Sequence, residues 1–253
     1  MPATVVAIHR YPVKGLSHQP LYRAALKAGE MLPFDRAYAL ALGSTVFDPN
    51  QPEWMPKTNF LMLQRDEKLA ALQTDFDPAT QTLTVSRGGR PVAKGKLDDP
   101  MGKAVIEQFF AAYMGEAARG QPKLVAAPGH NFSDYRMKVV SIINLASVKD
   151  LERIVGAPVD PLRFRGNLLV EGLPAWQEFQ WIGKEFRIGD VPVRTVKRIQ
   201  RCAATSVNPE TAKRDINVVQ SLVRGYGHPD MGIYVEVLAD GTIAPGAVLT
   251  PPG

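Results

Sequence analysis

The sequence contains very little cysteine: Cys202 is the single cysteine in 253 residues. One thiol cannot form a disulfide within the chain, which excludes a disulfide-stabilised secreted module. It also excludes iron–sulfur clusters and zinc sites built from several cysteines, because these need several thiolates from one chain. The sequence therefore predicts a protein of a reducing compartment, the cytoplasm, that folds by burying apolar side chains.

Long apolar runs and charge blocks are also missing. No stretch reaches the roughly 18 consecutive apolar residues expected of a membrane span, and residues 1–15 lack the apolar run of a signal peptide. The formal net charge is +5, without a basic tail or an acidic block. We therefore expect no membrane span and no nucleic-acid partner, whereas a local anion-binding pocket fits this charge well.

Several catalytic motifs are absent as well. The sequence has no HExxH pair, no GxSxG nucleophile elbow, no phosphate loop ending in GK[ST] and no GxGxxG after a strand. The four histidines, at positions 9, 18, 130 and 228, are isolated from one another. Zinc hydrolases, serine hydrolases and nucleoside triphosphatases therefore lack their defining residues here.

The apolar pattern predicts many short strands and a few helices. Helical spacing favours helices over residues 101–114, 144–155 and 216–224. Strands are expected over residues 4–9, 36–42, 69–76, 82–86, 137–143, 167–170, 179–188, 191–199 and 231–238. This combination predicts an α+β fold that is mostly β, with barrel-like sheets. Residues 115–122 have the composition of a linker, so we place a domain boundary there and divide residues 1–118 from 119–253.

An unusual group of cations precedes the cysteine. Four basic residues, Arg194, Lys197, Arg198 and Arg201, fall within eight positions before Cys202, with no acidic residue among them. Such a field favours the thiolate, which acts as a nucleophile or a soft metal ligand. The alternative is that Cys202 is a small buried apolar residue without a chemical role.

Two further groups of cations lie elsewhere in the chain. Arg163 and Arg165 alternate just before an apolar run, so an extended backbone would place both guanidinium groups on one side. Lys14 lies in a turn near the N-terminus, and Arg36 follows Asp35. Each group could equally be solvated or paired with carboxylates. Together they suggest that separate loops bring cations to one anionic ligand, held near one thiolate.

These residues also carry a family resemblance. Residues 11–14, Tyr-Pro-Val-Lys, resemble the opening motif of MOSC proteins, named for the C-terminal domain of molybdenum cofactor sulfurase, and Asp35-Arg36 resembles their DR motif. Residues 163–167 are similar to their FRPN segment, with Gly166 in place of proline, and residues 201–211 and 232–246 resemble the two closing signatures. The resemblance implies an N-terminal barrel-like domain over residues 1–118 and a MOSC β-barrel domain with peripheral helices over residues 119–253.

The family resemblance implies a molybdenum–pterin cofactor whose metal is bound by Cys202. Arg201 would lie beside the metal as the second catalytic residue. The remaining residues would hold the pterin and its phosphate: Lys14, Gly15, Arg36, Asn144, Ser147, Arg163, Arg165, Asn167 and Tyr234. Gly15 stands where many members have serine, which removes one hydroxyl group from the expected phosphate contacts.

Three functions remain open at this point. The first is a reductase of small N-hydroxylated compounds, similar to the amidoxime-reducing branch, with electrons from a separate ferredoxin- or cytochrome-type protein. The second is a cofactor carrier or sulfur-transfer protein with a persulfide on Cys202. It would not itself release sulfur from cysteine, because no domain for pyridoxal phosphate is expected. The third is a non-catalytic barrel that binds anions or RNA.

Overall fold

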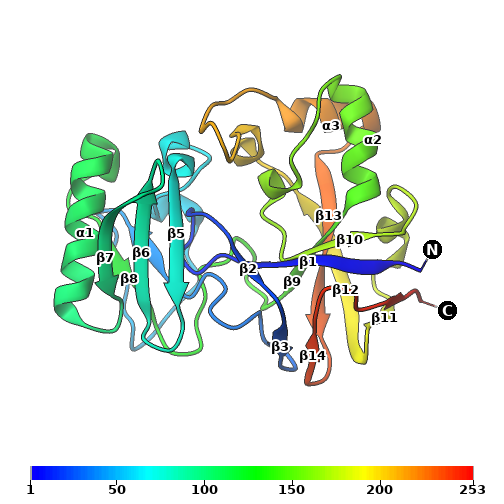
Figure 1. The fold of residues 1–253 in the computed structure, drawn as a ribbon, viewed down its shortest axis with the longest axis horizontal. Coiled ribbons are helices and arrows are strands. Elements are labelled where there is room, and N and C mark those ends of the chain that lie inside the picture. The colour runs from blue at the N-terminus through cyan, green and yellow to red at the C-terminus, as the bar shows by residue number, and fades with distance from the viewer. Residues whose placement is uncertain (1, 253) are drawn as a thin grey trace.

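The computed structural model describes residues 2–252, which form two groups of strands with helices at their edges (Figure 1). The strands are β1 (Thr4–Arg10), β2 (Gln19–Leu21), β3 (Ala24–Leu26), β4 (Ala39–Ala41), β5 (Leu72–Asp77), β6 (Thr82–Arg87), β7 (Arg90–Lys96), β8 (Lys123–Val125), β9 (Val140–Asn144), β10 (Leu168–Glu171), β11 (Glu185–Ile188), β12 (Val191–Gln200), β13 (Asp230–Val237), β14 (Gly241–Ile243) and β15 (Leu249–Thr250). The helices are α1 (Pro100–Met114), α2 (Leu145–Val155) and α3 (Val218–Tyr226).

The larger group is an eight-stranded sheet with the order β15-β11-β12-β13-β9-β10-β1-β2. Neighbouring strands are antiparallel except β9 and β10, which run parallel. The alternating apolar residues of these strands form one continuous core, and α2 and α3 pack together at one end of the sheet (Figure 1). The side chains of this core include Ile8, Ile142, Val170, Val193 and Val235.

The two ends of this sheet approach each other. An isolated bridge joins Thr4 in β1 to Val248 beside β15, and the Leu249 amide donates to the Ala3 carbonyl oxygen at 2.8 Å. The ladders nevertheless leave β2 and β15 as edge strands, so the described residues form a strongly curved sheet without complete closure. Both chain ends lie on the same side of the molecule (Figure 1).

The smaller group contains the sheet β5-β6-β7, the pair β4-β8 and α1, which packs against β7. The helix α1 begins after Asp99, whose carboxylate accepts from the Gly102 amide at 2.8 Å, and ends at Gly115 with φ of 57°. These ends confirm the helix predicted from residues 101–114. The helix and the sheet share a second apolar core that includes Leu72, Leu83, Ile106 and Phe110.

The prediction of an α+β, mostly β chain with peripheral helices is confirmed. Two segments differ from the expected strands. Residues 179–188 begin as a 3-10 helix, Gln177–Trp181, and turn at Gly183 with φ of 78° before β11 starts. Residues 69–76 likewise begin as a 3-10 helix, Glu67–Ala71, before β5. Short apolar runs do not distinguish strands from such turns.

The division at residue 118 stays a prediction. The first strand, β1, belongs to the large sheet of the C-terminal half, and β8, after the division, pairs with β4. The chain therefore crosses twice between the two groups of strands, and the loops at these crossings lie beside the cavity described next. No helix in the described part of the chain combines the length and the apolar character needed to cross a bilayer.

Candidate functional site

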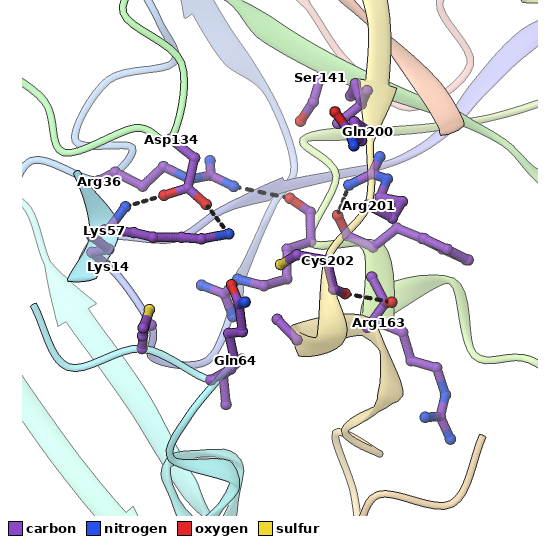
Figure 2. Close-up of a pocket in the computed structure, with 18 of the residues that line it drawn as sticks. Lys14, Arg36, Lys57, Gln64, Asp134, Ser141, Arg163, Gln200, Arg201 and Cys202 are labelled. Carbon is purple, nitrogen blue, oxygen red and sulfur yellow. Dashed lines mark hydrogen bonds and ion pairs between the residues drawn. The ribbon is translucent and has the colours of Figure 1, made fainter. Parts of the chain in front are cut away.

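A cavity of about 140 Å³ lies where loops of the N-terminal half meet the end of β12 (Figure 2). Because like charges repel and burial disfavours each charged form, a cavity lined mainly by cations is stabilised when an anion enters it. Five of its cations are those that the sequence predicted for one site. We call it the cationic cavity; its charged lining residues are Lys14, Arg36, Lys57, Arg163, Arg165, Arg201 and Asp134.

Lys14 lies on the loop after β1 and is almost completely buried. Its Nζ donates to the Phe132 carbonyl oxygen at 2.8 Å and forms an ion pair with Asp134 (Figure 2). The Nζ of Lys57 lies 3.8 Å from the second carboxylate oxygen of Asp134. Burial lowers the pKa of Lys14, and Asp134 opposes this effect. Asp134 therefore serves two cations as an internal counter-ion.

Gly15 lines the cavity next to Lys14 and has φ of 82°. A Cβ atom built at this position would lie 2.8 Å from the Leu61 carbonyl oxygen, closer than real Cβ contacts. The backbone conformation and the close approach both require glycine here. The hydroxyl group that serine would supply at this position is thus excluded by the path of the chain.

Arg36 and Arg165 lie over the same aromatic ring. Their guanidinium carbons are 4.8 Å and 4.3 Å from the ring centroid of Tyr11, within the range of cation–π attraction. Arg36 also forms an ion pair with Asp35, and its Nη2 donates to the Arg165 carbonyl oxygen at 2.9 Å. The hydrogen bonds found among residues 2–252 include none donated by the Arg165 side chain, and burial lowers its pKa to about 10. Arg165 is thus the cation most available to a ligand.

Arg163 has a different environment. The expected extended backbone at residues 163–165 is wrong: residues Pro161–Phe164 form a 3-10 helix, and Arg165 has a left-handed φ of 51°. The buried Arg163 side chain forms an ion pair with Asp215 at 2.7 Å and donates to the Ser206 carbonyl oxygen at 3.2 Å. Arg163 lines the cavity, but Asp215 already neutralises its charge, so it attracts an anionic ligand less strongly than Arg165 does.

Arg201 and Cys202 follow the end of β12. The Nε of Arg201 donates to the Met231 carbonyl oxygen and its Nη1 to that of Phe164, each at 2.8 Å. Burial lowers the pKa of Arg201 to about 10. Cys202 is half-buried, and its carbonyl oxygen accepts from the Thr205 hydroxyl at 2.9 Å. The lone thiol and a rigidly held cation thus line the same cavity.

The other three cations before Cys202 do not line this cavity. Arg194 pairs with Glu185 at 2.7 Å on the exposed side of β12. Register shifts occur in the pairing with β13 after Thr195 and after Arg198, and they change which face the following residues occupy. Lys197 and Arg198 lie over aromatic rings instead. Of the predicted cluster, only Arg201 lines the cavity together with Cys202.

Tyr234 and Asn167 are placed differently with respect to the cavity. Tyr234 in β13 lines it and stacks on Tyr135 with ring centroids 5.4 Å apart. Asn167 lies behind the wall, where its Oδ1 accepts from the Ser141 hydroxyl at 2.8 Å and its Nδ2 donates to the His9 carbonyl oxygen. Asn167 thus connects β9 to β1 and orients Ser141, which does line the cavity.

Asn144 and Ser147 are not brought to the cavity. Asn144 caps α2, with its Oδ1 accepting from the Ala146 amide at 3.0 Å. Its Nδ2 donates to the carboxylate of the buried Glu178 at 2.8 Å, and the Ser147 hydroxyl donates to the same carboxylate at 2.9 Å. Asn144 and Ser147 were expected to bind the phosphate of the cofactor. In the structure they bind the Glu178 carboxylate instead.

Sequence reasoning missed Asp134, Lys57 and Tyr11 as parts of the site. Asp134 lies in an irregular loop, Lys57 begins the short 3-10 helix Lys57–Asn59, and no motif marks either residue. Tyr11 belongs to the recognised Tyr-Pro-Val-Lys segment, so its position beside Lys14 was a usable signal. Its cation–π contacts with Arg36 and Arg165 could not be predicted, because these residues are far apart in the chain.

Two of the solved structures that this chain resembles are only weakly similar to it. The YuaD protein from Bacillus subtilis aligns over 98% of this chain and 94% of its own, with a TM-score of 0.45 and 13% identity. YiiM from Geobacillus stearothermophilus aligns over 44% of this chain and 52% of its own, with a TM-score of 0.35 and 21% identity.

Comparison with protein families and curated proteins is more informative. Residues 127–250 match the model of the MOSC domain. Mitochondrial amidoxime reducing component 2 from Bos taurus is 29% identical over 119 residues, which cover 42% of this chain and 35% of that protein. Mitochondrial amidoxime-reducing component 1 from Homo sapiens is 34% identical over 70 residues, or 28% of this chain and 20% of that protein. The chain therefore matches only a minor part of each of these relatives.

Proposed function

Because residues 127–250 of this chain carry a MOSC domain, we propose that it binds a molybdenum–pterin cofactor in the cationic cavity and reduces N-hydroxylated compounds. The single observation that carries the proposal is that the only thiol of the chain lines the cavity on which six cationic side chains converge. The partial matches to amidoxime reducing components support the reaction type.

The residues present fit such a cofactor. A thiolate is a suitable protein ligand for molybdenum that already has sulfur ligands from the pterin. Arg165 lies in the wall as a charged donor whose side chain donates no hydrogen bond within residues 2–252, and the site needs an anion to satisfy it. Gly15 keeps the wall open where a side chain would intrude on Leu61. The thiolate ligand, the positive charge and the open wall at Gly15 are thus all compatible with a molybdenum–pterin cofactor.

The reaction assigned to the site is the cleavage of an N–O bond. When bound, the cofactor supplies the two-electron redox chemistry. Two electrons and two protons convert R–C(NH2)=N–OH into R–C(NH2)=NH and water, so one proton goes to nitrogen and one leaves with the oxygen. We propose that the electrons come from a separate ferredoxin- or cytochrome-type protein.

The side chains of the cavity would bind and orient rather than transfer electrons. Lys14 and Arg36 would hold the phosphate, and Arg165 the polar edge of the pterin. Arg201, fixed by two backbone carbonyl oxygens, would stabilise negative charge beside Cys202. With a pKa lowered to about 10, Arg201 remains protonated at neutral pH.

The first test is metal analysis of protein produced in a host that makes the cofactor. We expect about one molybdenum per chain in the wild type and a loss of most of it in Cys202→Ser, because oxygen is a poorer ligand than sulfur for a soft site. Wild-type protein that contains no molybdenum, or Cys202→Ser that retains all of it with full reductase activity, would contradict the proposal.

A sulfur-transfer role is the second candidate, and it is favoured by the partial exposure of Cys202. A persulfide on this thiol would be accessible to a partner protein. Cyanide treatment would release sulfur as thiocyanate from wild-type protein and not from Cys202→Ala. A molybdenum-loaded reductase without cyanide-labile sulfur rules out this second role.

A further inference from the structure

A second cavity lies directly beside the cationic cavity. It has a volume of about 460 Å³, within the range of about 300–1,000 Å³ typical of small-molecule sites. Two of the shared residues, Gly15 and Ala204, have minimal side chains, and Ala204 is two positions after Cys202. We call this space the apolar cavity; it shares the lining residues Gly15, Leu63, Arg163, Arg165 and Ala204 with the cationic cavity.

The walls of the apolar cavity have a different character from those of its neighbour. Leu16, Leu72, Leu162 and Val207 line it, together with the small side chain of Ala70. Removing apolar ligand surface from water at such walls favours binding in proportion to the area buried. The cavity therefore suits a hydrocarbon group rather than a phosphate or the polar edge of a pterin.

Two carboxylates also line the apolar cavity. Asp160, whose Oδ1 accepts from the Leu162 amide at 2.8 Å, and the exposed Glu210 are both among its lining residues. Arg163 and Arg165 line the same cavity, so these carboxylates balance its positive charge and the cavity suits a neutral ligand. An amidoxime is uncharged at neutral pH, so the substrate of the proposed reaction meets this requirement.

One buried polar group marks the cavity as a binding site. Tyr11 lines it and is 1% exposed, and its hydroxyl has no hydrogen-bond partner among residues 2–252. A buried hydroxyl without a partner destabilises the protein, because it has lost its hydrogen bonds to water. The nitrogen or oxygen of a ligand in this space would satisfy it.

Resting on the proposed function, we propose that the apolar cavity binds the hydrocarbon group of the substrate, an aryl or alkyl group on the N-hydroxylated amidine carbon. Gly15 and Ala204 line both cavities with minimal side chains, so in this proposal the reactive N–O group reaches Cys202 beside them while the hydrocarbon lies against Leu72 and Leu162. This chain therefore selects amidoximes with bulky apolar substituents, and Ala70 sets the space available to them.

The test uses Ala70→Phe, which fills the apolar cavity without changing any residue of the cationic cavity. Ala71→Phe is the matched control, because Ala71 lies in the same 3-10 helix and does not line either cavity. Reduction of benzamidoxime and of acetamidoxime is measured for the holoprotein, with molybdenum content and urea unfolding as checks. Titration calorimetry measures binding of benzamidine and of acetamidine to the same samples.

In Ala70→Phe, kcat/KM for benzamidoxime and the affinity for benzamidine should fall roughly tenfold or more, because a phenyl group loses its apolar contacts. The values for the methyl compounds should change less than about twofold, because a methyl group buries little apolar surface. An equal loss for both sizes, or an equal effect in Ala71→Phe, would overturn the proposal. Loss of molybdenum in Ala70→Phe alone would assign the cavity to the cofactor and overturn it as well.

Failure of the apolar-cavity assignment can be distinguished from failure of the proposed reductase function. If the wild type contains no molybdenum, the reductase proposal fails, and benzamidine binding alone decides the apolar cavity. Leu162→Ala provides the opposite change, since it enlarges the cavity. It should improve binding of naphthamidine relative to benzamidine, and an unchanged ratio of the two affinities would contradict the assignment.

Discussion

The guanidinium Nη2 of Arg36 donates a hydrogen bond of 2.9 Å to the backbone carbonyl oxygen of Arg165. Both residues have a left-handed φ of 51°, and both side chains lie over Tyr11. One cation thus holds the backbone of the other across 129 positions in the sequence. The cationic cavity exists because loops from two groups of strands are locked together at this contact.

The first prediction concerns Arg36→Lys. Lysine keeps the charge but cannot contact Asp35 and the Arg165 carbonyl oxygen together with a planar fork. Because Asp35 is buried, loss of its partner should lower the free energy of unfolding by about 1–3 kcal/mol. Molybdenum content should fall too. Urea unfolding and metal analysis check both, and the exposed Arg23→Lys, which should match the wild type, is the control.

The second prediction concerns the internal counter-ion of the cavity. In Asp134→Asn, Lys14 and Lys57 lose the carboxylate that compensates them. Binding of inorganic phosphate, measured by titration calorimetry, should tighten roughly tenfold at low salt, because the ligand no longer competes with an internal anion. The exposed Asp48→Asn should leave the affinity unchanged. Weaker phosphate binding in Asp134→Asn would show that the carboxylate organises the cavity instead of competing for it.

The third prediction is a pH dependence. Burial, with a smaller contribution from the neighbouring His18, lowers the pKa of His9 to about 4. A histidine with a lowered folded-state pKa favours the unfolded chain once it is protonated there. The free energy of unfolding should therefore be constant above about pH 6.5, the ordinary histidine pKa, and fall as the pH decreases toward 4.

Urea unfolding at pH 7.5 and pH 5 measures this effect. In His9→Phe the decrease between the two pH values should be smaller than in the wild type, whatever the stability of the variant at pH 7.5. Measurements at pH 7 and pH 8 are the control, since no change is expected between them. An identical pH dependence in both proteins would show that His9 does not titrate in this way.

The sequence predicted the identity of several residues at the site. It did not predict the ion pairs and backbone conformations that hold them there. Lys14, Arg36 and Arg201 were predicted from local motifs, and they meet in one cavity. Asp134 could not be predicted, since an irregular loop places it and only the folded chain brings it to Lys14. The left-handed conformation of Arg165 was also missed, because no turn signal in the sequence required it there.

Asn144 and Ser147 show a different limit. The strand-to-helix junction was correctly predicted, and such junctions bind anions. The residue that occupies it, Glu178, directly precedes the strand expected over residues 179–188 and lies in the 3-10 helix Gln177–Trp181. The junction therefore binds a carboxylate of the chain that is 34 positions away in sequence, and not an anionic ligand.

The fourth prediction separates these residues from the cavity. In Ser147→Ala, Glu178 loses one hydrogen bond inside the protein, and burial already raises its pKa. Stability should fall by about 1–3 kcal/mol, while molybdenum content and KM stay those of the wild type in the protein that remains folded. Arg165→Gln should do the opposite. It should lose most of its molybdenum while its free energy of unfolding stays close to that of the wild type. Loss of metal in Ser147→Ala at full stability would restore Ser147 as a cofactor contact.

The last prediction uses two glycines with similar backbones. Gly15 has φ of 82° and Gly29 has φ of 68°, so alanine costs about 1–2 kcal/mol at each from the left-handed conformation alone. Nothing lies within 4 Å of a Cβ at Gly29, whereas at Gly15 the Leu61 carbonyl oxygen lies at 2.8 Å. Gly15→Ala should therefore lose a further 1–3 kcal/mol, roughly, because the segment at Leu61 must move. It should also bind less molybdenum than Gly29→Ala, since that movement changes the wall shared by the two cavities. Equal unfolding free energies for the two variants in urea would show that the loop at Leu61 adapts without cost, and that the absence of a side chain at Gly15 does not shape the site.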